Sequence, residues 1–345
     1  MRAAVIHAPH DLRIETVSAA APGPGPGQVK VRIKAGGICG SDLHYFQHGG
    51  FGAVRLQEPL IPGHEAAGIV EETGSGVQAL KPGMRVAINP SLACGQCRFC
   101  QTGLQQHCLD MRFYGSAMRF PHVQGLFRES LVCEAAQAHP VAEAVSMAEA
   151  AMAEPLAVCL HAANRAGSLL GKRVLITGCG PIGALMAVAA RRAGAAEIII
   201  TDVTAAPLLI AEKLGADQAI DTARNPEAMR DFARGKGQFD VLFEASGASR
   251  AFNDALALVR PQGIIVQIGN GADFTLPVST LVAKEIDWRG TFRFHSEFGL
   301  AVELLNKRLV DVMPLLTATL PLEQAAEAFV LAGDRQRAMK VQLSF

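Results

Sequence analysis

The sequence predicts an α/β protein of two domains, one β-rich and one built on a doubly wound parallel sheet. Three observations predict this: a length of 345 residues, short turn-bounded strands up to residue 132, and alternating strand and helix patterns after residue 148. A chain this long fits two domains of about 100–200 residues each better than one hydrophobic core. We expect residues 1–149 and 285–345 to form the β-rich domain and residues 150–284 the other.

The first domain shows strand patterns between turn residues. Apolar and basic residues alternate over residues 29–33, as on a strand with one buried face, and residues 85–88 are similar. The proline-glycine run Pro22–Gly27 precedes the first of these strands. It is either a flexible linker or, more simply, a connection within one β-rich domain.

The second domain shows strand and helix patterns in alternation, which is typical of a parallel sheet covered by helices. The predicted strands are residues 172–177, 197–201, 239–243 and 263–268. The predicted helices between them are residues 182–193, 208–214 and 250–259. After about Lys284 we expect the chain to return to the first domain, with helices over 298–308 and 322–332.

Composition and charge exclude several classes of protein. Half of the residues are hydrophobic and 19% are charged, which is a globular composition. The 32 basic residues balance 32 acidic ones without a basic run, so no nucleic-acid partner is expected. No uninterrupted apolar stretch follows Arg2, and the most apolar segment, 141–160, contains three glutamates and a proline. We therefore expect a soluble, cytoplasmic protein with no secretory signal and no membrane partner.

A glycine-rich turn directly follows the first predicted strand of the second domain and opens the next helix. Glycines in that context allow a tight turn, a close approach to a pyrophosphate and close packing of helix on strand, as in a Rossmann dinucleotide site. Asp202 lies 19 residues beyond Gly183, at the end of the next strand, where it can accept hydrogen bonds from an adenosine ribose. The alternative is a glycine turn and a helix-capping aspartate in an unrelated α/β fold. The expected cofactor-binding residues are Gly178, Gly180, Pro181, Ile182, Gly183 and Asp202.

The same aspartate bears on the choice of coenzyme. Its carboxylate would repel a 2′-phosphate, and residues 203–206 contain no arginine to attract one. We therefore expect NAD to be preferred, with NADP as a possible alternative.

Four of the eight cysteines crowd into one loop with metal-ligand spacing. Four thiolates form a closed tetrahedral shell for zinc with no position left for a substrate, so the predicted role is structural. Buried free thiols or a redox couple are the alternatives. The predicted ligands are Cys94, Cys97, Cys100 and Cys108.

A second candidate metal site combines residues from distant segments. Cys39, His64 and either Glu65 or Glu154 would provide three ligands and an open fourth position, as a catalytic zinc requires. Taken singly, each of these residues is better explained as an ordinary core cysteine or surface glutamate. We expect two zinc ions per chain.

With these motifs the chain resembles the zinc-dependent medium-chain dehydrogenases/reductases over essentially its whole length. The segment 37–42, the Gly63-His64-Glu65 triplet, the four-cysteine loop and the glycine turn occur in the family's order. His44-Tyr45, residues 153–156 and residues 291–293 are similar to the sorbitol dehydrogenase branch. Further stretches are similar to members of that branch that act on the sugar acid L-idonate: residues 87–91, 110–113, 115–118, 120–123 and 292–294.

The resemblance implies a GroES-like β domain that carries both zinc ions, a Rossmann domain that binds NAD, and an active site between them. It places the catalytic zinc on Cys39, His64 and a glutamate. We favour Glu154 as ligand or water-bridged partner and Glu65 as the exchange alternative. The resemblance also implies that the protein forms a homodimer or a homotetramer.

The implied reaction is reversible oxidation of the C5 hydroxyl of L-idonate by NAD, giving 5-keto-D-gluconate. Ser41 is expected to accept the hydroxyl proton and pass it through the nicotinamide ribose to His44, unless His44 is an ordinary surface imidazole. A neutral polyol such as sorbitol or xylitol is the alternative substrate, and a non-catalytic nucleotide-binding relative is the alternative class. The expected substrate contacts are Tyr45 for a hydroxyl, Arg293, and, for the carboxylate, Arg112 and Arg119, the latter equally well a solvated surface arginine.

Overall fold

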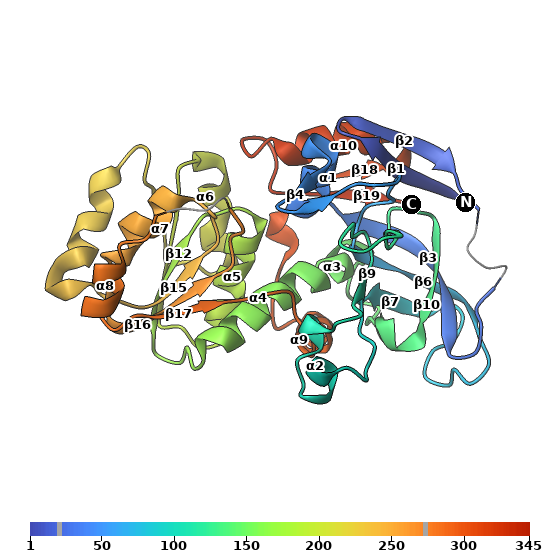
Figure 1. Ribbon diagram of the computed structural model, residues 1–345, viewed down its shortest axis with the longest axis horizontal. Helices are drawn as coiled ribbons and strands as arrows, with labels where there is room; N and C mark the ends of the chain where they lie inside the picture. Colours follow the sequence, from blue (N-terminus) through green and yellow to red (C-terminus); the bar gives the residue numbers. More distant parts are fainter. Residues whose placement is uncertain (19–22, 272–274) are drawn as a thin grey trace.

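The computed structural model describes residues 1–18, 23–271 and 275–345, which form two lobes, each built on one large sheet (Figure 1). Pro22 of the proline-glycine run lies outside the described residues. The strands of the first lobe are β1 Arg2–Ala8, β2 Asp11–Thr16, β3 Gln28–Gly37, β4 Gly50–Phe51, β5 Val54–Arg55, β6 Glu65–Thr73, β7 Arg85–Ile88, β8 Ser91–Leu92, β9 Arg112–Phe113, β10 Ser130–Glu134, β11 Ala138–Pro140, β18 Leu316–Pro321 and β19 Lys340–Ser344. Its helices are α1 Gly40–His48, α2 Arg98–Gln101, α3 Met147–Ala151 and α10 Ala325–Gly333.

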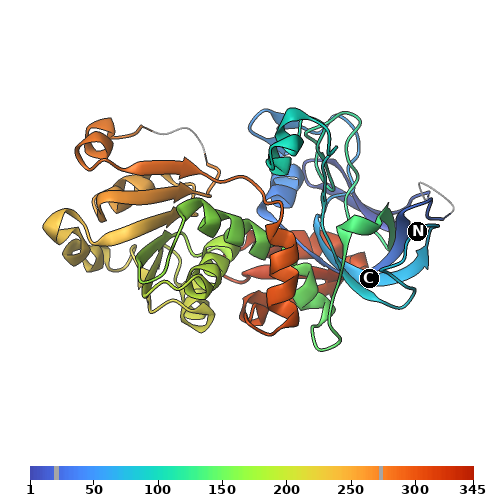
Figure 2. The same ribbon diagram turned by 90° about the horizontal axis from the view of Figure 1, so that it is seen from below.

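The second lobe alternates strands and helices, as the sequence predicts. Its strands are β12 Arg173–Thr177, β13 Glu197–Asp202, β14 Gln218–Asp221, β15 Phe239–Glu244, β16 Val259–Gln267 and β17 Asp287–Gly290. Its helices are α5 Pro181–Arg192, α6 Ala205–Ala211, α7 Ser249–Leu256 and α8 Val278–Ala283. Two further helices, α4 Ala153–Ala166 and α9 Glu297–Asn306, pack against each other between the lobes (Figures 1 and 2).

The sheet of the first lobe has the order β11-β7-β6-β3-β19-β18, with β10 also paired to β3. Alternation along β3 buries Val29, Val31 and Ile33 completely against the core. The strands β19 and β18 come from the end of the chain and join the sheet of the first lobe. Both termini accordingly lie in this lobe (Figure 1).

The sheet of the second lobe is parallel throughout, with the order β14-β13-β12-β15-β16-β17. Successive residues of β12 point to opposite faces: Val174 and Ile176 pack with α4 and α5, and Leu175 packs in a separate cluster with Phe252 of α7. A sheet covered on both faces in this strand order is the Rossmann arrangement, which confirms the predicted fold class.

The prediction missed β14 and β17, the two edge strands. Both have four residues, and their patterns mix polar and half-exposed positions, so neither carries the buried apolar run that marks the central strands. β17 extends this sheet beyond residue 284, where we placed the boundary, and the division into domains stays a prediction. Within the described ranges no helix has the length and apolar character needed to cross a membrane.

Candidate functional site

The four-cysteine loop folds into a compact sulfur cluster around α2. Cys97 caps the start of α2, and its Sγ lies 3.6 Å from Cys100 Sγ and 4.0 Å from Cys108 Sγ, while Cys94 Sγ is 4.0 Å from Cys100 Sγ. A tetrahedron with zinc–sulfur bonds of about 2.3 Å has edges of about 3.8 Å, so the cluster fits a zinc ion. All four cysteines are free of disulfides.

The backbone around this cluster favours thiolates. The amides of Leu109 and Cys100 lower the pKa of Cys97 to about 6, whereas burial raises the pKa of Cys100 to about 12. Further amide donors reach Cys108 Sγ from Cys94 and Asp110, at 3.2 Å and 3.3 Å. Amide groups directed at sulfur stabilise the charge that a metal ligand must carry.

The second cluster arises from the pairing of β3 with β6. Gly37 stands opposite Glu65 in that ladder, so the chain that leaves β3 at Cys39 lies beside the chain that enters β6 at His64. A Cβ at Gly37 would stand 2.1 Å from Glu65 Oε2, so a larger residue there would displace the Glu65 carboxylate. The donor atoms of Cys39, His64 and Glu65 lie within 4.8 Å of one another, and a sulfur, a nitrogen and an oxygen together suit zinc.

Asp42 supports this cluster from the first turn of α1. It is fully buried and accepts hydrogen bonds from the Cys39 amide at 3.0 Å and the Gly63 amide at 2.9 Å. Its Oδ1 lies 3.7 Å from His64 Nδ1. Burial alone would lower the pKa of His64, but the charges of Asp42 and Cys39 raise it well above its ordinary value. A carboxylate beside a metal-binding histidine orients the ring.

Lys340 is a functional candidate that the sequence reasoning missed. Its Nζ donates to Glu65 Oε1 at 2.6 Å and to the Ile38 carbonyl at 3.1 Å, and both charged side chains are almost completely buried. Burial opposes the charged form of Lys340, but Glu65 raises its pKa above the ordinary value. Because 275 residues separate the partners, no local pattern could have revealed the pair.

Glu154, the glutamate that we favoured as ligand, lies on α4 outside the set of three donors. It is buried, and burial raises its pKa to about 7, while the charges of His64 and Lys340 act in the opposite direction. Its carboxylate is therefore close enough to interact with the cluster, but the structure groups Glu65 with Cys39 and His64. Which glutamate binds the metal stays a prediction.

Arg293, the predicted substrate-binding arginine, lies near Glu154 and Tyr45, and its role toward a substrate stays a prediction. Its guanidinium stacks 4.1 Å from the centre of the Phe113 ring and interacts electrostatically with Glu154 and Tyr45. Burial lowers the pKa of Arg293 to about 10. The Tyr45 hydroxyl is buried and accepts a hydrogen bond from the Ala117 amide at 3.0 Å, which leaves its proton available to a ligand.

The other two arginines are placed differently. Arg119 forms an ion pair with Asp110 at 2.7 Å, and both side chains are largely exposed. Arg112 is exposed on β9, opposite Leu92. Their role toward a carboxylate stays a prediction.

Ser41 and His44 lie three residues apart on α1, so their side chains share one face of the helix. Ser41 is half-buried and His44 is exposed. Partial burial lowers the pKa of His44, and the neighbouring His48 lowers it further. A neutral imidazole open to solvent is suited to carry a proton out of the site.

The glycine turn joins β12 to α5 with the geometry of a phosphate-binding turn. Gly178 has a left-handed φ of +87°, and a Cβ at Gly183 would stand 1.8 Å from the Gly178 carbonyl oxygen. Gly180 caps α5 and Pro181 occupies its first position, so free amides face the space in front of the helix. Ile182 lies within the first turn of α5.

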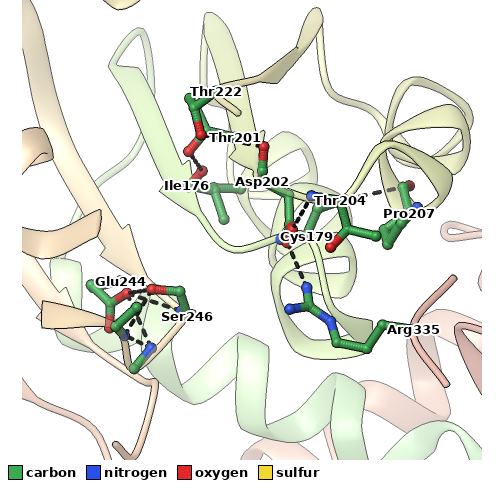
Figure 3. A network of polar contacts seen from close by, with 12 residues as sticks. Ile176, Cys179, Thr201, Asp202, Thr204, Pro207, Thr222, Glu244, Ser246 and Arg335 are labelled. Carbon is green, nitrogen blue, oxygen red and sulfur yellow. Dashed lines mark hydrogen bonds and ion pairs between the residues drawn. The ribbon is translucent and has the colours of Figure 1, made fainter. Parts of the chain in front are cut away.

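Two buried carboxylates hold the strand ends that flank this turn (Figure 3). Asp202 accepts hydrogen bonds from the amides of Cys179 and Thr204, at 2.7 Å and 2.8 Å. Glu244, at the end of β15, accepts from the Ser246 amide at 2.9 Å. Arg335, which the sequence reasoning did not consider, also donates to Asp202.

Comparison with known proteins identifies close relatives of this architecture. The family model "Alcohol dehydrogenase GroES-like domain" matches residues 25–143, and the model "Zinc-binding dehydrogenase" matches residues 181–307. The chain is 44% identical to L-idonate 5-dehydrogenase (NAD(P)(+)) of Escherichia coli over 91% of each protein. It is 36% identical to sorbitol dehydrogenase of Homo sapiens over 94% of this chain and 90% of the relative. The crystal structure of the Escherichia coli L-idonate 5-dehydrogenase superposes with a TM-score of 0.95 at 41% identity, covering 100% of this chain and 98% of that one.

Proposed function

Because the chain belongs to the zinc-containing medium-chain dehydrogenases, in the sorbitol dehydrogenase branch, we propose that it oxidises the C5 hydroxyl of L-idonate to 5-keto-D-gluconate, reversibly. It is an NAD(P)-dependent zinc dehydrogenase of the polyol and sugar-acid type. The observation that carries the chemistry is the set of three donors, Cys39, His64 and Glu65. The sugar acid is supported by the similarity to the bacterial L-idonate enzyme.

The residues of the site divide the work of the reaction between them. Zinc on the three donors would supply a Lewis acid for the substrate hydroxyl, and NAD(P) at the glycine turn would accept a hydride. Ser41 takes the hydroxyl proton, and His44 delivers it to solvent, because His44 is exposed one turn further along α1. Arg293, whose charge interacts with that of Glu154 beside the three donors, is proposed to hold substrate oxygens.

One observation favours a neutral polyol as the alternative substrate. Arg119 is already paired with Asp110, so only Arg112 of the two predicted carboxylate contacts lacks an ion-pair partner among the described residues. Sorbitol or xylitol would need no such cation. This alternative keeps the same zinc, coenzyme and proton route.

A substrate panel distinguishes the two proposals. Steady-state rates are measured for L-idonate, sorbitol, xylitol and D-gluconate with NAD and with NADP. We expect kcat/KM for L-idonate to exceed that for sorbitol by about tenfold or more, since one charge-assisted hydrogen bond is worth about 1.5–3 kcal/mol. A higher kcat/KM for either neutral polyol contradicts the sugar-acid proposal.

Two further measurements address the arginine and the class of protein. Replacement of Arg112 by alanine should reduce kcat/KM for L-idonate about tenfold and leave kcat/KM for sorbitol unchanged. Equal losses for the two substrates would remove Arg112 from the carboxylate site.

Metal analysis should give two zinc ions per chain. One zinc per chain, combined with no turnover on any substrate of the panel, would favour a non-catalytic nucleotide-binding protein.

A further inference from the structure

An arginine near the end of the chain connects the two lobes. It contacts Asp202, the aspartate that we expect to bind the adenosine ribose of the coenzyme. Arg335 follows α10 by two residues and donates from Nη2 to Asp202 Oδ2 at 2.6 Å (Figure 3). The Asp202 side chain is 3% exposed and the Arg335 side chain 54% exposed. The carboxylate is therefore held in place by its backbone donors, while the guanidinium lies at the surface and can turn.

This contact supplies a charge that is missing from the local sequence. Residues 203–206 contain no arginine or lysine, so Asp202 by itself would leave only negative charge where the adenosine ribose binds. Arg335 comes from the first lobe, 133 residues further along the chain. Its cation neutralises the carboxylate from the side that faces solvent.

An open cleft of about 630 Å³ lies beside the ion pair. Arg335 and Thr204 both line it, so the cleft reaches the turn that follows Asp202. Phe46 and Gln47 of α1 and Asp334 contribute to its walls. The space is large enough for a phosphate ester that extends from a ribose bound at Asp202.

The charges around the cleft make Arg335 the group that a second phosphate would contact. Besides Arg335, the titratable residues of the lining are the acidic Asp334 and His10. Asp202 does not line the cleft but is paired with Arg335 beside it. Asp334 has a partner of its own, Arg337, at 4.0 Å. A dianionic phosphate next to these carboxylates needs a cation, and guanidinium pairs with phosphate as it does with carboxylate, through charge-assisted hydrogen bonds.

We propose that Arg335 determines coenzyme range: it pairs with Asp202 when NAD is bound and turns to the 2′-phosphate when NADP is bound. The inference rests on the NAD(P)-dependent dehydrogenase activity, but not on the identity of the sugar substrate. It adds to the expectation from residues 203–206, which considered only the local sequence, because the proposed cation for a 2′-phosphate comes from the opposite lobe.

The test compares coenzymes in Arg335→Gln, Arg335→Lys and the unchanged protein. Arg335→Gln removes the cation proposed to bind the 2′-phosphate, so it should lower the ratio of kcat/KM for NADP to kcat/KM for NAD about tenfold or more. In Arg335→Lys the same ratio should stay within about threefold of its value in the unchanged protein. Calorimetric titration with 2′,5′-ADP and with 5′-AMP provides a readout that needs no turnover. In Arg335→Gln the affinity for 2′,5′-ADP should fall by a similar factor and that for 5′-AMP should change little.

Arg337→Gln is the matched control. It removes the same charge from an exposed side chain that lies two residues further along the chain. Equal losses for both coenzymes in Arg335→Gln would show that the arginine only holds the lobes together, and would overturn the proposal. An equal change in Arg337→Gln would also overturn the proposal. So would an affinity for 2′,5′-ADP that is the same in the unchanged protein and in Arg335→Gln. If no sugar or polyol is oxidised, the proposed function fails, and the nucleotide titrations still decide the role of Arg335.

Discussion

At the scale of single residues, the buried pair of Lys340 and Glu65 links the last strand to the metal-binding cluster. Both side chains are at most 3% exposed, so the charge of either one depends on the other. Removing one partner of a buried pair leaves an uncompensated charge in a medium of low polarity. Lys340 is therefore the cation that holds the Glu65 carboxylate in the arrangement that the structure shows.

Replacement of Lys340 by methionine should destabilise the protein by about 3–5 kcal/mol, because Glu65 then stays buried without its cation. Urea unfolding measures the loss. The control is Lys30→Met, which breaks a partly exposed pair with Glu72 and should cost about 1 kcal/mol or less. Equal losses in the two variants would show that the buried pair has no special energetic role.

A second residue-scale prediction concerns His44 and pH. The imidazole must be neutral to accept a proton during oxidation, and burial together with His48 lowers its pKa below the usual 6.5. Oxidation should therefore stay constant at neutral pH and fall as the pH drops below about 6.5 through that lowered pKa. His44→Gln should remove this acidic limb and lower kcat about a hundredfold.

His48→Gln is the matched control on the same helix. It removes a neighbouring positive charge that lowers the pKa of His44, so the acidic limb should move to slightly higher pH with kcat retained. An unchanged pH profile in His44→Gln would exclude His44 from the proton route. The pH dependence of kcat and of kcat/KM gives both readouts.

At the scale of elements, the turn between β12 and α5 uses its glycines for different purposes. A Cβ at Gly183 would collide with the Gly178 carbonyl oxygen, whereas a Cβ at Gly180 meets no atom within 4 Å. Gly180 also has an ordinary φ of −71°. Gly183 is therefore needed for helix–strand packing, and we expect Gly180 to keep space clear for the coenzyme.

The two alanine variants should separate these roles. Gly183→Ala should lose both stability, by about 1–3 kcal/mol, and coenzyme binding, because the helix must move. Gly180→Ala should keep its free energy of unfolding within about 1 kcal/mol and lose coenzyme affinity about tenfold or more. Thermal unfolding and NADH fluorescence titration measure the two quantities. Full coenzyme affinity in Gly180→Ala would contradict the proposed pyrophosphate site.

At the scale of the whole molecule, Glu297 ties the helices between the lobes. Its carboxylate pairs with His161 on α4 at 3.0 Å and accepts from Asn164 at 2.9 Å. Burial alone would raise the pKa of Glu297, but these contacts and the His295 amide lower it to about 2. The same segment carries Arg293, four residues earlier, so this junction also positions the arginine that we propose as a substrate contact.

Because the pKa of Glu297 is lowered on folding, its contribution to stability is present above about pH 4.5 and is lost as the pH falls toward 2. Glu297→Gln should cost at most about 3 kcal/mol at pH 7, and the difference from the unchanged protein should shrink between pH 5 and pH 2. Urea unfolding at a series of pH values measures this. Glu303→Gln, which removes an exposed carboxylate on the same helix, is the control. A difference that does not depend on pH would contradict the ionic role of Glu297.

Local patterns were sufficient for the central strands, the glycine turn and the four-cysteine loop. A buried strand of a parallel sheet carries a continuous apolar run, a phosphate turn needs glycines at set intervals, and four thiols within 15 residues can close on one ion by themselves. The edge strands β14 and β17 lacked such a run and were missed. Cys39 and His64 could be named as candidates because their neighbours resemble a known family.

Only the folded chain shows which distant charges face one another. The pairing of β3 with β6 places Glu65, and not Glu154, in the set with Cys39 and His64. The return of the chain brings Lys340 to Glu65, and Arg335 to Asp202. Sequence periodicity reports whether a position is buried within its own element, but an ion pair depends on where two elements meet. That meeting is set by the packing of the whole molecule, so these cations had no signal in the sequence around their partners.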